Sequence, residues 1–204
     1  MNLLKKSILL TISSSLLITA GLTTAQDSKP TEDKESTNTE TKAKPTIDYK
    51  NQTEKLKWRS VNDGVMGGKS EGKYYFSEAN NLMFRGEISL KNNGGFASIR
   101  SYGEQYDLSK SKGMEVTFRG DGRTYYFTAR AGGNSRLAYW SPLKTKAGEW
   151  MTVKVPFTSF YATSFGRKIP KLKLNTSKIS SFGFMLYDKK DDTFSLEVKS
   201  IKSY

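Results

Sequence analysis

Residues 194–199 read Phe194-Ser195-Leu196-Glu197-Val198-Lys199, with apolar and polar side chains in strict alternation. This period of two is typical of a β-strand with one face against a core and the other toward water, because successive side chains point to opposite faces. Residues 114–119, Met-Glu-Val-Thr-Phe-Arg, have the same period. Both stretches therefore predict strands of an antiparallel sheet that is buried on one face.

Similar alternation recurs on either side of these two stretches, while the periodicity of a helix is absent from the sequence after residue 51. Glycine, asparagine and aspartate separate the runs, most clearly at residues 92–95 and 120–122, and these are turn-forming residues. The predicted strands are residues 56–61, 73–77, 82–90, 96–102, 114–119, 125–130, 137–143, 151–156, 179–187 and 193–203.

About ten strands fall within residues 51–204, a length of about 150 residues that suffices for one hydrophobic core. The sequence therefore predicts one all-β domain, a two-sheet sandwich of the jelly-roll type. The last predicted strand brings the C-terminal residues into a sheet.

The first 25 residues have the pattern of a secretory signal peptide. Lys5 and Lys6 precede an apolar run over residues 7–22, and small residues lead to a cleavage point after Ala25. Three serines interrupt the apolar run, so a signal peptide is favoured over an uncleaved membrane anchor. These residues predict export to the periplasm or the extracellular space, with no transmembrane segment in a soluble mature protein.

Residues 26–50 are polar and charged, with almost no apolar side chains to bury, and this composition predicts a disordered linker. Their charges nearly cancel, so about +12 of the net charge of +13 belongs to residues 51–204. Such a basic domain suits an anionic partner: a membrane surface, an acidic polysaccharide, a nucleic acid or an acidic protein. Export argues against nucleic acid.

The sequence contains no cysteine and no histidine. This excludes disulfides, cysteine-ligated zinc and every catalytic dyad that uses histidine. Carboxylate chemistry remains, either glycoside hydrolysis or a calcium site. Nothing in the sequence pairs any two of the carboxylates on or beside strands, which are Asp107, Glu87, Glu115, Glu149 and Glu197. Asp188, Asp191 and Asp192 indicate a solvated hairpin tip or a structural calcium site. No catalytic residue, metal ligand or cofactor is predicted.

Residues 63–70, Asp-Gly-Val-Met-Gly-Gly-Lys-Ser, superficially resemble a phosphate-binding loop. The spacing is one residue short and no helix pattern follows, so a nucleotide site is not predicted. Two interpretations remain: a glycine-rich turn, or a tight loop that presents Asn62, Asp63 and Met66 at one end of the sandwich.

Aromatic residues often stand in pairs, as at Tyr125-Tyr126 and Tyr139-Trp140, so that one ring of each pair is predicted in the core and the other outside. Exposed rings beside arginines 119, 123, 130 and 136 would form a platform on which sugars or bases stack. The alternative is that strands simply favour aromatic residues.

Several blocks of sequence, in order, resemble the complex I intermediate-associated protein 30 family. They are Trp58, residues 61–70, 84–86, 92–100, 120–123 with Tyr125, 149–150, 153–157, 166–167, 179–186 and 194–198, and Ile201. The resemblance implies a galactose-binding-like jelly roll similar to carbohydrate-binding modules. It also implies a non-catalytic assembly factor, the role of the family in mitochondria. The glycine-rich loop, Arg100, Arg123 and Asp188 match the family motif.

These observations together predict a non-enzymatic, chaperone-like or assembly-factor-like binding module, expected to be monomeric. It engages an envelope protein or an assembly intermediate through one sandwich face or the loop at residues 62–70. The alternatives are a protein that binds an anionic or neutral glycan on exposed aromatic rings, and an envelope glycoside hydrolase. The candidate binding residues are Asn62, Asp63, Met66, Ser70, Arg100, Arg123, Tyr125 and Trp140.

Overall fold

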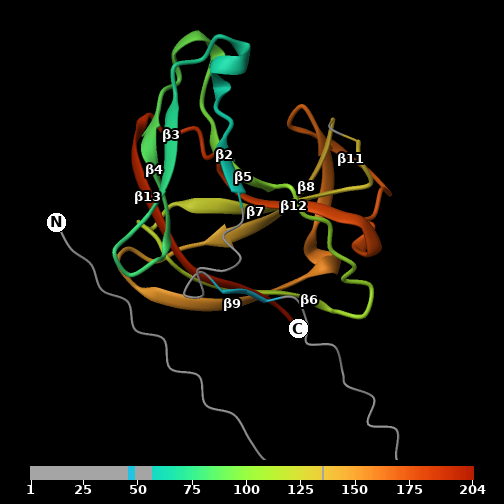
Figure 1. Cartoon of the computed structure of the whole chain (residues 1–204). Coiled ribbons are helices and arrows are strands. Elements are labelled where there is room, and N and C mark those ends of the chain that lie inside the picture. Colours follow the sequence, from blue (N-terminus) through green and yellow to red (C-terminus); the bar gives the residue numbers. More distant parts are fainter. Residues whose placement is uncertain (1–45, 49–56, 135) are drawn as a thin grey trace, which may run out of the picture. The chain divides into compact units, whose positions relative to one another are not determined.

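Two antiparallel sheets make up the part of the chain that the computed structural model describes, which is residues 46–48, 57–134 and 136–204. These residues form thirteen strands and four short 3₁₀ helices (Figure 1). No helix among them is both long and apolar enough to cross a membrane. The predicted signal peptide and residues 26–45 of the predicted linker lie outside the described residues.

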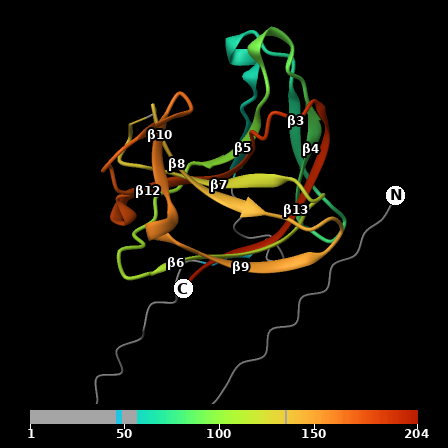
Figure 2. The same ribbon diagram turned by 180° about the vertical axis from the view of Figure 1, so that it is seen from behind.

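The first sheet has the order β3-β4-β13-β6-β9, with β1 also paired to β13. Its strands are β1 (Thr46–Asp48), β3 (Glu71–Phe76), β4 (Leu82–Ile88), β6 (Gly113–Arg119), β9 (Trp150–Pro156) and β13 (Asp192–Ser203). Both alternating stretches belong to it, since residues 194–199 lie in β13 and residues 114–119 in β6. Phe194, Leu196 and Val198 are buried as predicted. Figure 2 shows β6 and β9 side by side from behind.

The second sheet has the order β11-β10-β8-β7-β12-β5-β2. Its strands are β2 (Lys57–Ser60), β5 (Ala97–Tyr102), β7 (Thr124–Ala131), β8 (Leu137–Lys144), β10 (Tyr161–Ser164), β11 (Arg167–Ile169) and β12 (Ile179–Leu186). Burial alternates along the whole of β7: Tyr125, Phe127 and Ala129 point into the core, and Tyr126, Thr128 and Arg130 point outward. This sheet therefore presents a regular row of outward side chains.

The core lies between the two sheets and is rich in aromatic residues. Phe84 of β4 and Phe194 of β13 meet edge to face with ring centroids 4.7 Å apart, and both contact Tyr125 of β7 from the opposite sheet. Edge-to-face contacts of this kind add to the free energy gained from burying the rings. The aromatic core fixes how the two sheets face each other.

All ten strands predicted from the sequence are present, and the prediction of an all-β jelly-roll sandwich is confirmed. Strands β1, β10 and β11 were not predicted. β1 falls within the predicted linker, where Thr46–Asp48 pairs with β13, so the ordered strands begin before residue 51. β10 and β11 are only four and three residues long, too short for an alternating pattern to stand out.

Candidate functional site

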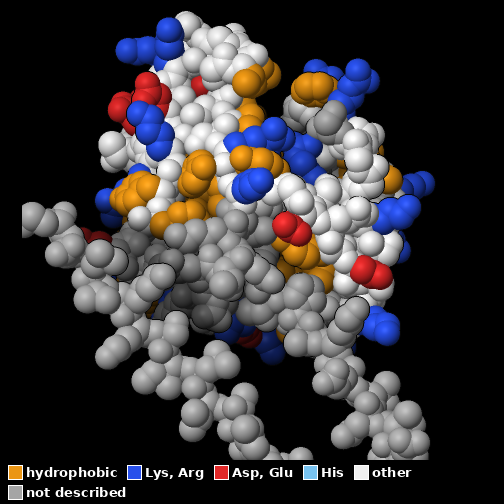
Figure 3. All heavy atoms as spheres, in the orientation of Figure 1, with side chains coloured by type: hydrophobic (Ala, Val, Ile, Leu, Met, Phe, Trp, Pro, Cys, Tyr) orange, Lys and Arg blue, Asp and Glu red, His pale blue; other side chains and the backbone are white. Residues whose placement is uncertain are grey.

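A cavity of about 540 Å³ opens on the outward face of the seven-stranded sheet. Its floor is formed by outward side chains of β5, β7, β8, β10 and β12, including Arg100, Arg130, Trp140, Thr163 and Met185. This volume is within the range of pockets that hold small ligands or short segments of another chain. Figure 3 shows this face hollowed, with basic and hydrophobic side chains gathered in the hollow.

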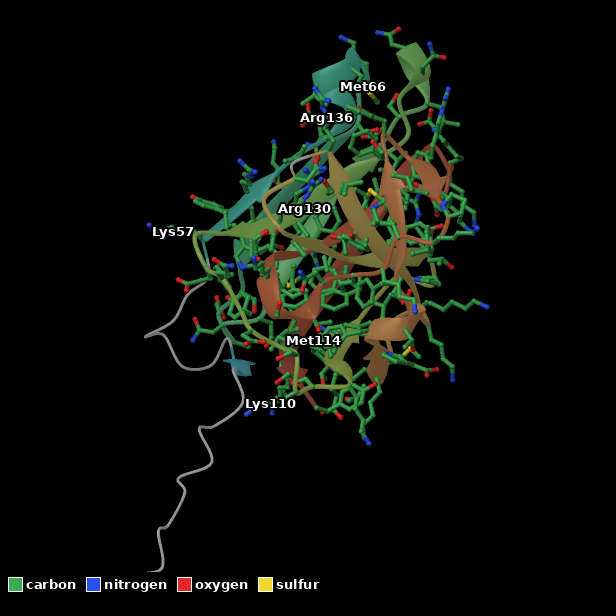
Figure 4. The ribbon with its side chains drawn as sticks, turned by 90° about the vertical axis from the view of Figure 1, so that its right-hand side faces the viewer. Lys57, Met66, Lys110, Met114, Arg130 and Arg136 are labelled. Carbon is green, nitrogen blue, oxygen red and sulfur yellow. The ribbon has the colours of Figure 1, made fainter. Side chains whose placement is uncertain are left out.

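Exposed apolar side chains stand at two places on the cavity wall. One is the 3₁₀ helix η2 (Asp63–Met66), where Val65 and Met66 are 73% and 63% exposed. The other is the β10–β11 hairpin, where Phe165 is 81% exposed. Figure 4 shows Met66, Arg136 and Arg130 toward one end of the sandwich, and Met114 and Lys110 toward the other. We call Val65, Met66 and Phe165 the apolar rim.

Phe165 occupies an unfavourable backbone conformation. It and Gly166 form the two-residue turn between β10 and β11, with φ of 48° and 75°. Turns with two positive φ angles favour asparagine and glycine, because a bulkier side chain raises the energy of the left-handed region. A phenylalanine that is exposed there gains little from burial to offset this cost.

The conformation of the η2 loop depends on Asp63, which is fully buried. Its carboxylate accepts hydrogen bonds from the backbone N–H groups of Ser70, Gly95 and Phe96 and from the Ser70 hydroxyl. Burial opposes ionisation, but these hydrogen bonds outweigh it and hold the pKa of Asp63 below its ordinary value. A Cβ at Gly68 would lie 2.4 Å from the Asp63 carboxyl carbon, which explains the glycine there.

Three arginines gather at the β2–β5 side of the sheet. Arg100 of β5 lies opposite Arg59 of β2 in the strand register, and Arg130 lies on β7 beyond β12. Burial lowers the pKa of Arg100 to about 10, with further lowering by the charges of Arg130 and Arg59. Burial followed by the charge of Arg59 also lowers the pKa of Arg130, whose Nη1 donates to the Leu137 carbonyl at 2.8 Å.

Trp140 lies at the centre of an aromatic cluster on the β8 side of the cavity. Its ring centroid is 5.3 Å from Tyr126, 6.0 Å from Tyr187 and 6.4 Å from Tyr161. The rings meet at angles of 43° to 71°, and Trp140 itself is only 9% exposed. Lys189 lies 4.4 Å from the Tyr187 ring centroid, a cation–π distance.

The structure brings three of the predicted site residues together in this cavity: Met66, Arg100 and Trp140. Asp63 and Ser70 instead bond to each other inside the loop. Asn62 begins the loop and donates to the Gly72 carbonyl at 3.1 Å. For these last three residues, the contacts observed are those that shape the loop.

Arg123 and Tyr125 lie away from the cavity, and their polar atoms make internal contacts. Arg123, 9% exposed, donates to both carboxylate oxygens of Asp188 at 2.7 and 2.9 Å. It also donates to the carbonyls of Lys190, Asp192 and Thr193. The hydrogen bond to Asp188 raises the pKa of Arg123. Tyr125 points into the core, and its hydroxyl donates to Asp121 at 2.8 Å.

Two of the carboxylates weighed for catalysis or calcium, Glu197 and Asp188, are engaged in ion pairs. Glu197 accepts from Arg119 and Asn81, and Asp188 is paired with Arg123. In the part of the chain that the structure describes, no three acidic side chains are grouped as metal ligands. The carboxyl groups whose pKa is shifted there, those of Asp63, Asp107, Asp188 and Glu197, all have a pKa below the ordinary value. A catalytic acid at neutral pH needs the opposite displacement.

Sequence reasoning missed Phe165, Thr163 and Tyr187 as cavity residues. The Phe165-Gly166 pair between two short polar runs was the available signal for the β10–β11 hairpin. Nothing local places Thr163 or Tyr187 in the cavity, because their neighbours there come from distant parts of the chain.

Comparison with solved structures places this fold among the galactose-binding-like jelly rolls. A family 11 carbohydrate-binding module of the Clostridium thermocellum cellulase Lic26A-Cel5E is 16% identical, with a TM-score of 0.59 over 78% of this chain and 94% of that one. A structure of a family 11 module from the same organism in complex with a β-1,3-1,4-mixed-linked tetrasaccharide is 17% identical. It gives a TM-score of 0.57, over 77% and 93% of the two chains. At this identity the likeness shows the fold alone.

The family profile of Complex I intermediate-associated protein 30 (CIA30) matches residues 47–198. The chain belongs to this family, and the resemblance found in the sequence is confirmed. Complex I intermediate-associated protein 30 of Mus musculus is 30% identical over 71% of this chain and 51% of its own length. A probable counterpart in Caenorhabditis elegans is 28% identical over 63% and 44%. The chain thus spans about half the length of the curated relatives it matches.

These relatives contradict the predicted location. The proteins from Mus musculus, Caenorhabditis elegans and Caenorhabditis briggsae are all named as mitochondrial, which points away from a periplasmic or extracellular place. The prediction rested on two lysines before an apolar run. Charge and hydropathy of that kind describe a targeting segment without fixing its destination, so the predicted location is withdrawn.

Proposed function

We propose that this chain is a non-catalytic binding module of the assembly-factor type, which holds a partner protein against the cavity of the seven-stranded sheet. Membership of the family supports the assembly role, since the relatives are named for their association with complex I intermediates. The absence of histidine and cysteine from the sequence supports binding rather than catalysis.

The apolar rim is the observation that carries this proposal. Val65, Met66 and Phe165 are large, exposed and placed on the wall of one cavity. Grouped exposed apolar side chains around a concave site mark protein interfaces more often than single exposed residues do. Phe165 also supports the proposal. Its left-handed backbone conformation lowers the stability of the free protein, and contact with a partner would offset that cost.

Photo-cross-linking in cells tests the proposal. Benzoylphenylalanine replaces Phe165 in one variant of the full chain and Tyr75 in a matched control. Tyr75 is 45% exposed on β3 of the other sheet. We expect one specific protein, identified by mass spectrometry, to be linked at position 165 and not at 75. The same protein linked equally at both positions, or no protein linked at 165, contradicts the proposal.

Carbohydrate binding is the second candidate, favoured by the aromatic cluster around Trp140, of which Trp140 and Tyr187 line the same cavity. One solved structure of similar fold is a complex with a tetrasaccharide. The angled packing of the rings and the 9% exposure of Trp140 leave little flat surface for a sugar ring to stack on. Binding to a neutral glycan array, reduced by Trp140→Ala, would establish this alternative in place of a protein partner.

A further inference from the structure

Positive charge is concentrated in the lining of the cavity. Arg100, Arg130, Arg136 and Lys189 all line it, and none of the described lining residues is Asp or Glu. Arg59 adds a charge beside Arg100 from the neighbouring edge strand. Like charges placed directly opposite each other in a sheet destabilise it. The free protein therefore holds these arginines together at a cost in stability.

Strand β12, which lies between the strands of Arg100 and Arg130, has a glycine on this face of the sheet. Gly183 pairs with Arg100 on one side and Thr128 on the other, and it contributes no side chain to this face. A Cβ at Gly183 would lie 2.4 Å from the Ile99 carbonyl oxygen and 2.8 Å from the Thr128 hydroxyl. These neighbours leave no space for even a methyl group at position 183, so at this position β12 places no side chain between Arg100 on β5 and Thr128 on β7.

Arg100 contrasts with the buried arginine that serves the fold. Arg123 has a carboxylate and three carbonyl acceptors. Within the described ranges, the side chain of Arg100 has no hydrogen bond or ion pair, although it is partly buried among like charges. A guanidinium that is desolvated without an acceptor gains strongly when an anion supplies one.

We propose that Arg100 and Arg130 bind carboxylates of an acidic segment of the partner protein, while apolar side chains of that segment contact Val65, Met66 and Phe165. This inference rests on the proposed function. Planar guanidinium groups match carboxylates in a forked, two-bond geometry. The combination of a basic floor with an apolar rim favours a peptide, because a peptide carries carboxylates and apolar side chains together, whereas an acidic glycan lacks the second kind.

A peptide titration tests the assignment. The full chain, labelled with ¹⁵N, is titrated with a capped hexapeptide of alternating Glu and Phe, and with its counterpart of alternating Gln and Phe. We expect the Glu peptide to bind roughly tenfold more tightly at low salt, since charge-assisted hydrogen bonds are stronger than neutral ones. The advantage should shrink as salt is added, because added ions screen the arginine charges.

Two variants locate the effect. Arg100→Gln should abolish the preference for the Glu peptide. Arg85→Gln, which removes an exposed arginine hydrogen-bonded to Ser195 on the other sheet, should preserve it. Thermal unfolding checks that both variants fold. The salt dependence of the unaltered chain tests, without any variant, whether the preference is electrostatic.

Three results would overturn the assignment: equal affinity for both peptides, a preference that persists in Arg100→Gln, or no binding of either peptide. Tighter binding of a galacturonic acid oligomer than of the Glu peptide also overturns it, in favour of an anionic glycan. Failure here is separable from failure of the proposed function. If Arg100→Gln does not affect the cross-link at position 165, the proposed binding module stands and only the role of the arginines is refuted.

Discussion

Replacing Asp63 with alanine should unfold the η2 loop and lower the stability of the whole domain. The change removes the acceptor for three backbone N–H groups, those of Ser70, Gly95 and Phe96, and for the Ser70 hydroxyl. A buried donor left without a partner costs about 1–3 kcal/mol. Since water entering the loop would recover part of this, we expect a loss of about 4 kcal/mol in the free energy of unfolding.

Urea unfolding followed by circular dichroism measures this loss, and calorimetry should show a melting temperature lower by about 8–16 °C. Asp107→Ala is the matched control, because Asp107 is exposed and accepts a local hydrogen bond from Ser109, two residues along the chain. We expect the control to cost less than about 1 kcal/mol. If Asp63→Ala costs no more than the control, the reasoning that this carboxylate holds the loop is refuted.

Three further predictions concern acid, Arg123 and Phe165. The pKa of Asp63 is below its ordinary value of 3.8, so its contribution to stability is complete above that pH and is lost as pH falls through the lower folded pKa. When the free energy of unfolding is measured as the pH is lowered, Asp63→Asn should lose less stability than the unaltered chain does. Arg123→Lys should cost about 2–4 kcal/mol in urea unfolding, because an ammonium cannot reproduce the fork to Asp188 while reaching three carbonyls; an unchanged midpoint would contradict this. Phe165→Asn should raise stability by about 0.5–1 kcal/mol, since asparagine tolerates positive φ, while weakening partner capture. A stabilised variant with undiminished capture would remove Phe165 from the interface.

The fold could be predicted well because the burial of one sheet face leaves a period of two in the sequence. Residues 194–199 and 114–119 show it without interruption, and both strands pack one face on the core. The short strands β10 and β11 could not be predicted from the sequence. Each has too few residues for the alternation of apolar and polar side chains to be recognised beside the exposed Lys168 and the turn residue Phe165.

The site could be predicted only in part, because residue type does not reveal which way a side chain points. For Tyr125-Tyr126 the alternation predicts one ring inside and one outside without saying which, and Tyr125, the predicted site residue, is the inward one. The sequence shows Asp63 only as a polar residue in a glycine-rich loop, yet its carboxylate accepts hydrogen bonds from Gly95 and Phe96, which are more than thirty residues away. Long-range contacts of this kind have no local signature in the sequence.

The three tryptophans of the chain report directly on the central claim, that the cavity of the seven-stranded sheet is the binding surface. Trp58 is buried in the core, Trp140 lines the cavity, and Trp150 is 44% exposed on β9 of the other sheet. Their indole N–H signals can be followed by NMR as a purified partner, obtained by co-purification with the full chain, is added. The account predicts that the Trp140 signal shifts while those of Trp58 and Trp150 stay in place. A shift of Trp150 with Trp140 unmoved would place the binding surface on the opposite sheet and contradict the account.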